Sequence, residues 1–361
     1  MSASGEGTTG ARNRPPLRIL ITLMGSLGDV TRGLAIAAAL KKFDPGTLIT
    51  WLVEPKCQGI VRLSSYIDRV VLFERGNGFS ALFAVRKRLR EERYDVALDL
   101  QRHLKSGILT YLSGASRRIG FARSNAKEGN WLFSTERIPS YDEKITNKFE
   151  AYERFLDALE VPRLSAESSS GASASYFPEA GLGGRAPSPL VEQVRRSSQR
   201  YVVLVLGSSW DSKNWMGQGY LGVASEIFKR QIGVVLLGDS SQVQLAEQLT
   251  AKLPGVFNFL GKTSLEDLVS LLEHADAAVG PDSGPGHIAA SVGTPYVGIF
   301  GATSPERTAP VGNYGRVIRA SLGCSPCYLR HCPGLGRLCM RLITVDQVLG
   351  ALLPLLEGDR S

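Results

Sequence analysis

The sequence has no long hydrophobic run and few aromatic residues, and each shortage argues against a class of protein. No apolar stretch among its 361 residues reaches the roughly 18 to 20 residues that a membrane-spanning helix needs. Segment 1–16 is polar and has no apolar core of the secretory kind, so we expect a disordered tail and a cytoplasmic protein. Aromatic residues make up 8% and do not interleave with the basic clusters, which argues against nucleic-acid binding.

Two familiar nucleotide-binding motifs are also missing. A glycine-containing turn at residues 24–30 (MGSLGDV) follows a strand-like run, but it lacks the G-x-G-x-x-G spacing of dinucleotide-binding folds. This disfavours a nicotinamide-dependent dehydrogenase. A second glycine-rich turn at residues 279–290 (VGPDSGPGHIAA) has no P-loop lysine, which argues against an ATPase.

The excess of positive over negative charge is confined to the first half of the chain. The formal net charge is +8, and Lys plus Arg outnumber Asp plus Glu by 26 to 18 through residue 163. From residue 164 onward the two classes are equal, at 16 each. A split of this kind indicates either that the first half meets an acidic partner or that it has a solvated basic surface. Charge alone leaves these two interpretations at even weight.

Strand-like and helix-like segments alternate in both halves, which predicts parallel sheets covered by helices. In the first half, strands are expected at 17–23, 48–53, 69–73 and 95–100, with helices at 31–42 and 80–93. In the second half, strands are expected at 201–207, 232–238, 276–280 and 295–301, with a last helix at 344–357.

A stretch rich in Ser, Ala, Gly and Pro separates the two halves and predicts a flexible linker. The fold class is therefore α/β, with two Rossmann-like, doubly wound domains that face a central cleft. Ligands of such sheets bind at the carboxyl ends of the strands. The expected organisation is a tail (1–16), an N-terminal domain (17–163), a linker (164–190), a C-terminal domain (191–342), and a last helix with its tail (343–361).

Asp29 is the candidate general base. It lies in the turn between the first strand and the first helix, where a carboxylate can face a cleft and accept a proton. The alternative is a helix N-cap, which is the commoner use of an aspartate at a helix entrance.

Residues 279–290 combine Asp282, Ser283, Gly284 and His287 on one turn at a helix start. Glycines leave backbone N–H groups accessible, and a helix N-terminus favours an anion, so this turn fits a pyrophosphate. An ordinary capped helix with His287 as a hydrogen-bonded core residue is the alternative. Residues 207–215 (GSSWDSKNW) add hydroxyls at Ser208 and Ser209 and a cation at Lys213, a pattern that is weak by itself.

Four of the five cysteines fall within one short segment with the spacing C-x2-C-x4-C-x6-C: Cys324, Cys327, Cys332 and Cys339. A structural zinc site and a reduced cluster that orders a loop carry equal weight here, while an iron–sulfur cluster or disulfides fit a cytosolic chain less well. The lone Cys57 is expected to be a small buried apolar residue.

Taken in order, these motifs resemble those of the ADP-heptose:lipopolysaccharide heptosyltransferases, family nine of the glycosyltransferases. The resemblance rests on G-S-L-G-D-V, R-R-I-G-F, S-S-x-x-x-K-x-W, D-S-G-x-x-H-x-A-A and G-I-F-G-A-T-S-P, and it extends from about residue 17 to residue 353. The segment CSPCYLRHCPGLGRLCM is similar to that of members that add the second heptose.

The resemblance implies a GT-B fold and inverting transfer of heptose from ADP-heptose to the lipopolysaccharide inner core, with no cofactor and no required metal. It implies Asp29 as the catalytic base and acceptor contacts from Arg102, Lys105 and Arg118. Implied donor contacts are Ser208, Ser209, Lys213, Asp239, Thr263, Asp282, Ser283, Gly284 and His287.

The basic half is then expected to hold the acceptor and to touch the anionic inner membrane from the cytoplasmic side, without nucleic acid. The alternatives are a relative that transfers another sugar to a cell-surface glycan and a non-catalytic nucleotide-sugar-binding protein.

Overall fold

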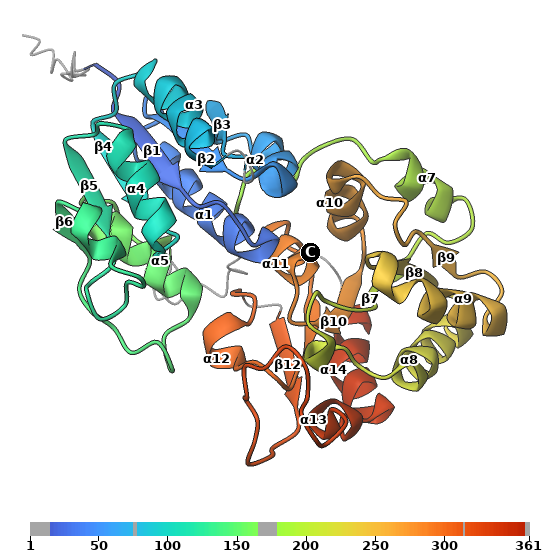
Figure 1. The fold of residues 1–361 in the computed structure, drawn as a ribbon. Coiled ribbons are helices and arrows are strands. Elements are labelled where there is room, and N and C mark those ends of the chain that lie inside the picture. The colour runs from blue at the N-terminus through green and yellow to red at the C-terminus, as the bar shows by residue number, and fades with distance from the viewer. Residues whose placement is uncertain (1–14, 75–77, 165–178, 313–314, 358–361) are drawn as a thin grey trace, which may run out of the picture.

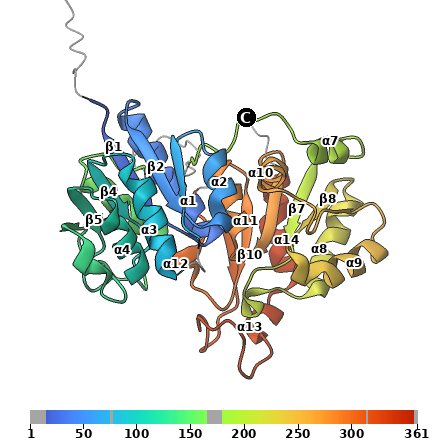
Figure 2. The same ribbon diagram turned by 45° about the horizontal axis from the view of Figure 1, so that its top comes forward.

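The computed structural model describes residues 15–74, 78–164, 179–312 and 315–357 of the chain. The expected tail and most of the expected linker lie outside these residues. The described part holds two six-stranded sheets that lie side by side, as Figures 1 and 2 show. The predicted α/β class with two Rossmann-like domains is confirmed, because every strand pairing in both sheets is parallel.

The first sheet has the strand order β3-β2-β1-β4-β5-β6. Its strands are β1 (Arg18–Thr22), β2 (Leu48–Val53), β3 (Arg69–Leu72), β4 (Val96–Asp99), β5 (Arg117–Gly120) and β6 (Glu136–Arg137). The helices between them are α1 (Leu27–Phe43), η1 (Pro55–Cys57), α2 (Gln58–Leu63), α3 (Gly78–Arg90), α4 (Leu104–Leu112), η2 (Asn130–Phe133) and α5 (Lys148–Asp157).

The second sheet repeats this plan with the order β12-β11-β10-β7-β8-β9. Its strands are β7 (Tyr201–Val205), β8 (Gly233–Leu237), β9 (Phe257–Asn258), β10 (Ala277–Pro281), β11 (Tyr296–Phe300) and β12 (Gly315–Arg319). Its helices are α7 (Pro189–Arg195), η3 (Asp211–Lys213), α8 (Gly217–Lys229), η4 (Ser240–Gln242), α9 (Val243–Lys252), α10 (Leu265–Glu273), α11 (Gly284–Ser291), α12 (Pro305–Thr308), α13 (Leu338–Arg341) and α14 (Val345–Glu357).

The predicted strands and the last helix agree with the structure to within a residue or two at each end. The first helix differs, because it begins at Leu27 rather than near residue 31. Ser26 is therefore its N-cap, and Asp29 lies inside the first turn, so the N-cap alternative for Asp29 is wrong. Local pattern missed this start because Gly28 is a poor helix former, whereas packing against the other domain holds the turn in helical form.

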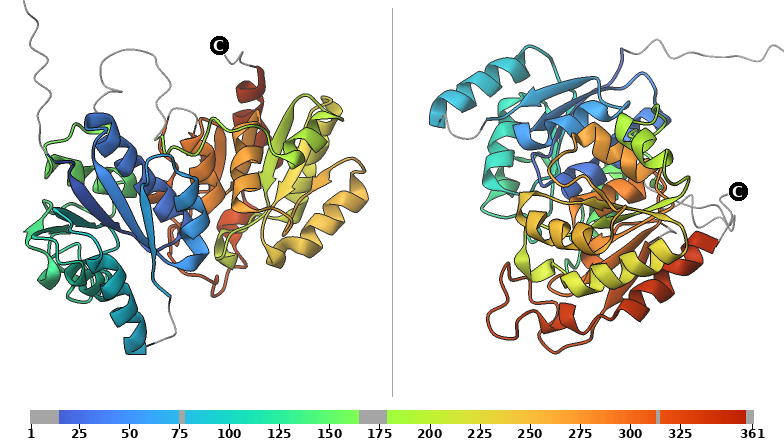
Figure 3. Two further views of the ribbon diagram at one scale, coloured as in Figure 1. Left: turned by 90° about the horizontal axis from the view of Figure 1, so that it is seen from above. Right: turned by 90° about the vertical axis from the view of Figure 1, so that its right-hand side faces the viewer.

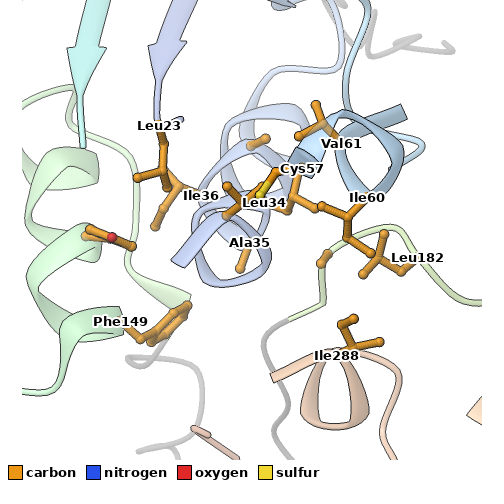
Figure 4. Packing of buried hydrophobic residues seen from close by; sticks show 14 of the residues in the cluster. Leu23, Leu34, Ala35, Ile36, Cys57, Ile60, Val61, Phe149, Leu182 and Ile288 are labelled. Carbon is orange, nitrogen blue, oxygen red and sulfur yellow. The ribbon is translucent and has the colours of Figure 1, made fainter. Parts of the chain in front are cut away.

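One hydrophobic cluster joins the two domains. It includes α1 and α2 from the first domain and Ile288 of α11 from the second. Figure 4 shows Ile288 and Leu182 on the side of α1 and α2 that faces the second domain. Leu182 belongs to the expected linker, and it is fully buried, so the described end of that segment is packed rather than flexible. Cys57 is buried in the same cluster, as predicted.

Helix α14 completes the core of the second domain, where Val348 and Leu352 pack against the far face of the sheet. The left view of Figure 3 shows the two domains side by side, with the helices of the cluster between the sheets. No helix in the described ranges is long and apolar enough to cross a bilayer.

Candidate active site

The N-terminal turns of α1 and α11 meet where the two domains face each other. A Cβ built on Gly28 would lie 2.6 Å from Cδ2 of His287, and one on Gly284 would lie 2.9 Å from the Leu27 side chain. Only glycine fits at such a close approach. Helices α1 and α11 thus bring the first predicted motif directly against the second.

The turn that carries Asp29 is held from the neighbouring strand. After β4 the side chain of Gln101 accepts hydrogen bonds from the backbone N–H of Met24 at 2.9 Å and of Gly25 at 3.4 Å. The carboxyl ends of β1 and β4 are adjacent in the sheet, so these loops share one edge. Asp29 is therefore placed at the strand ends, where ligands of this fold bind.

Two cations contact the same oxygen of Asp29. Lys148, the first residue of α5, has Nζ 3.0 Å from Oδ1, and Arg32 on the next turn of α1 donates to Oδ1 from Nη2. The other oxygen, Oδ2, accepts only a longer bond of 3.2 Å from Ser26 among the contacts of the described residues. Sequence reasoning missed Lys148 because it lies 119 positions away.

His287 joins this group from the opposite domain. Its Nε2 lies 2.6 Å from Nη1 of Arg32, and both side chains are buried. A guanidinium can only donate, so Nε2 accepts and the imidazole is neutral. Burial together with the charge of Arg32 holds the pKa of His287 well below its ordinary value.

The charge state of Asp29 follows from its neighbours. Burial alone would raise the pKa of this carboxyl, but the charges of Lys148 and Arg32 and their hydrogen bonds outweigh it and hold the pKa well below its ordinary value. Asp29 is thus ionised, and its two cationic partners hold it in one orientation.

A cavity of about 190 Å³ opens beside Asp29 on the side of the first domain. Its wall includes Lys148, Arg102, Lys127 and, from the second domain, Arg307. Arg102 and Arg307 both contact Glu143, at 2.5 Å and 3.1 Å. The cavity is therefore rich in cations, and it is completed by both domains.

The structure separates the three predicted acceptor residues. Arg102 lines the cavity, and its loop is fixed by the buried carboxylate of Asp99, which accepts from the backbone N–H of Gln101 at 3.0 Å. Lys105 lies outside the cavity wall, over the ring of Phe73 at 5.3 Å. Arg118 is also absent from that wall and belongs to β5 rather than to a loop, and its guanidinium is occupied by the backbone oxygens of Phe133 and Ala115 at 2.8 Å and 2.7 Å.

On the second domain, Lys213 is directed at the start of α11. Its Nζ lies 2.8 Å from Oδ2 of Asp282 and 4.6 Å from the centre of the Trp210 ring. Asp282 also accepts from Thr303 at 2.8 Å and from Thr308 at 3.1 Å. Burial would raise the pKa of Asp282, but Lys213 outweighs it and lowers the pKa.

The remaining predicted donor residues lie along one edge of the second sheet. Ser283 is the N-cap of α11, but its side chain makes no capping bond, and Gly284 begins the helix. Ser208 follows β7, where Asn214 holds its backbone N–H at 2.8 Å, and Ser209 beside it is exposed. Asp239 follows β8 and caps η4, and Thr263 lies in the loop after β9, just before the N-cap of α10.

The four clustered cysteines, Cys324, Cys327, Cys332 and Cys339, line one largely apolar cavity of about 220 Å³. All are free thiols, and three backbone N–H groups lower the pKa of Cys332. No group of three or more His, Cys, Asp or Glu side chains within the described ranges is placed to hold a metal ion. The geometry therefore lends no support to the zinc alternative.

The comparisons with known proteins agree with this geometry. The sequence model of glycosyltransferase family 9 (heptosyltransferase) matches residues 82–336. Lipopolysaccharide core heptosyltransferase OpsX of Haemophilus influenzae is 27% identical over 84% of each chain. Lipopolysaccharide heptosyltransferase 1 of Pseudomonas aeruginosa is 27% identical over 88% of this chain and 87% of its own.

Solved structures show the same fold. The E. coli heptosyltransferase WaaC with ADP superposes with a TM-score of 0.74 at 20% identity, over 94% of this chain and all of its own. A family 9 glycosyltransferase of Veillonella parvula has a TM-score of 0.76 at 19% identity, over 95% of this chain and 98% of its own. Because the family model matches more than half of this chain, the chain belongs to glycosyltransferase family 9, the heptosyltransferases.

Proposed function

We propose that the protein transfers heptose from ADP-heptose to the inner core of lipopolysaccharide, with inversion at the anomeric carbon. The relatives named above are lipopolysaccharide heptosyltransferases, and E. coli WaaC has been solved both with ADP and with ADP-2-deoxy-2-fluoro heptose. The single observation that carries the proposal is the meeting of α1 and α11, which sets an ionised Asp29 beside the helix terminus suited to a diphosphate.

The donor is expected to extend along the edge of the second sheet. The strand order β10-β7-β8-β9 places Ser283, Ser208, Asp239 and Thr263 at successive strand ends. Neighbouring strands lie about 4.8 Å apart, so the edge spans about 14 Å. We assign the diphosphate to the α11 terminus and Lys213, the ribose to Asp239 and the adenine to the loop of Thr263.

The transfer step is a single displacement. A lone pair of an acceptor hydroxyl oxygen attacks the anomeric carbon, the hydroxyl proton passes to Asp29, and the bond from that carbon to the diphosphate oxygen breaks with its electrons on ADP. Lys213 and the N–H groups at the start of α11 offset the charge that develops on ADP. For this reason the proposed reaction needs no resident metal.

The cavity beside Asp29 is proposed to hold the acceptor. Arg102, Lys127 and Arg307 suit the carboxylate and phosphate groups of an inner core. Lys105 and Arg118 lie outside the cavity wall, so a role for them in acceptor binding would have to be at a greater distance.

Peripheral contact with an anionic membrane is the proposed origin of the charge split. Two apolar side chains next in sequence to cavity residues are exposed, Leu104 at 40% and Ile145 at 73%. Apolar side chains among cations suit a membrane surface of negative charge. Binding to vesicles of anionic lipid that survives high salt unchanged would contradict this electrostatic part of the proposal.

The transfer itself is tested by mass spectrometry of the product after incubation with ADP-heptose and truncated lipopolysaccharide cores. We expect the acceptor to gain one heptose with the wild type and to gain nothing with Asp29→Ala, although this variant binds ADP with ordinary affinity. If the enzyme transfers a different sugar from another nucleotide donor and transfers none from ADP-heptose, the assignment of ADP-heptose as the donor is wrong. Near-normal turnover by Asp29→Ala would remove Asp29 as the base.

A further inference from the structure

We infer that Lys148 and Arg32 are positioning residues that clamp one oxygen of Asp29 and leave the other free to take the acceptor proton. The inference rests on the proposed function, because it assumes that Asp29 is the base.

The clamp is directed at a single atom. Lys148 Nζ lies 3.0 Å from Oδ1, and Arg32 donates to the same oxygen. An ionised carboxylate has about four lone-pair positions, two on each oxygen. Two cations fill those on Oδ1, while Oδ2 accepts only the 3.2 Å bond from Ser26 among the described contacts. The lone-pair position that is free to accept a proton from an acceptor hydroxyl therefore lies on Oδ2.

Both cations are held in place by the opposite domain. Arg32 is fixed by the 2.6 Å contact of its Nη1 with His287 of α11. Lys148 follows Asn147, the N-cap of α5, whose side chain donates to the backbone oxygen of Ala309 at 3.2 Å and accepts from the N–H of Phe149 at 2.9 Å. The second domain thus contacts the clamp at Arg32 and at the residue before Lys148.

The setting of these groups differs from that of a surface ion pair. The side chains of Arg32 and Asp29 are 6% and 18% exposed. Every element around Asp29 contributes a titratable or charged group that interacts with it electrostatically. These groups are Arg32 on α1, Lys148 and Tyr152 on α5, His287 on α11 and Cys57 of η1. Arg32 and Lys148 are the cations of this set, so they keep Asp29 ionised between turnovers.

The test compares two substitutions of Lys148 with a control in the loop that precedes α5. Lys148→Met keeps much of the length of the side chain and removes its charge, and Lys148→Arg keeps the charge. Lys144→Met is the control, because Lys144 is exposed and precedes α5. The measurements are kcat/KM for a soluble acceptor at neutral pH and saturating donor, and the dissociation constant of ADP.

We expect kcat/KM at neutral pH to fall by about tenfold or more in Lys148→Met, since the carboxylate loses one of the two groups that fix its Oδ1. We expect Lys148→Arg, which keeps the charge, to recover most of kcat/KM, and Lys144→Met to leave it at the wild-type value. The affinity for ADP is expected to stay within about twofold in all three variants. A merely structural role for Lys148 would lower the rate in Lys148→Arg as much as in Lys148→Met, because neither side chain restores the packing of the lysine.

A kcat/KM that stays at the wild-type value in Lys148→Met, or that falls equally in Lys148→Arg, would overturn the inference. The failure of the proposed function is recognised separately, by Asp29→Asn. If Asp29→Asn turns over at the wild-type rate, the base assignment itself is wrong. If Asp29→Asn is inactive while Lys148→Met turns over at the wild-type rate, Asp29 remains the base and only the clamp is refuted.

Discussion

Gly28→Ala tests the contact between α1 and α11 more directly than any change of a charged group. The added Cβ would lie 2.6 Å from Cδ2 of His287, whereas ordinary contacts begin near 3.4 Å. The ring cannot withdraw freely, because His287 is buried and its Nε2 lies 2.6 Å from Arg32. The two helices must separate or the imidazole must leave its partner.

The magnitude follows from two opposing effects. Overpacking at a well-packed site costs about 1–3 kcal/mol. Replacing glycine by alanine in a helix stabilises the folded state by up to about 1 kcal/mol. We therefore expect a net loss of about 0.5–2 kcal/mol in the free energy of unfolding, measured by urea denaturation. Because Asp29 follows directly, kcat/KM is expected to fall by about tenfold or more, as small misplacements of reacting groups do.

Two other glycines of helices provide matched controls. Gly350 lies in the middle of α14, and nothing comes within 4 Å of its added Cβ, so Gly350→Ala is expected to stabilise by about 0.5–1 kcal/mol. In Gly33→Ala the Cβ meets Leu23 and Trp51 within the first domain, so stability falls while ADP affinity stays normal. If Gly28→Ala is as stable as Gly350→Ala and fully active, the close approach of the two helices is not part of the working enzyme.

Further predictions concern the charges of the cleft. Lys213→Met is expected to weaken ADP binding by about ten- to a hundredfold, because it removes one or two charged hydrogen bonds. An unchanged dissociation constant for ADP in titration calorimetry would count against a role of Lys213 in donor binding. Arg102→Ala is expected to raise the KM for acceptor, whereas Arg118→Ala, which removes bonds to two backbone oxygens, should lower stability and leave that KM alone. The pKa of Asp282 is lowered in the folded state, so its stabilising contribution is complete above the unfolded value near 3.8 and is lost as pH falls through the folded value. Asp282→Asn should therefore flatten the acid side of the stability curve, and an unaltered curve would argue that this ion pair contributes nothing.

Much of the fold could be predicted from local pattern. Alternating strand and helix segments, with glycine at the strand ends, are properties of neighbouring residues, and most strands were placed to within a residue or two. The predicted start of α1 is too late because Gly28 indicates a turn by local pattern, whereas its contact with α11 is a long-range one. The short strand β5, which carries Arg118, is not predicted in this way, because its pairing with β4 is a long-range contact.

The sequence by itself determined the class of fold, the uneven distribution of charge, and the identity of Asp29, Lys213 and the turn of Ser283 as chemically capable groups. Only the tertiary structure decided which of these groups meet. Arg32 and His287 are 255 positions apart, and Lys148 and Asp29 are 119 apart. The first contact depends on how α1 and α11 pack between the two domains, and the second on how α1 and α5 pack within the first domain, which no local propensity encodes. The same packing separated Arg102, which lines the cavity, from Arg118, which supports the sheet.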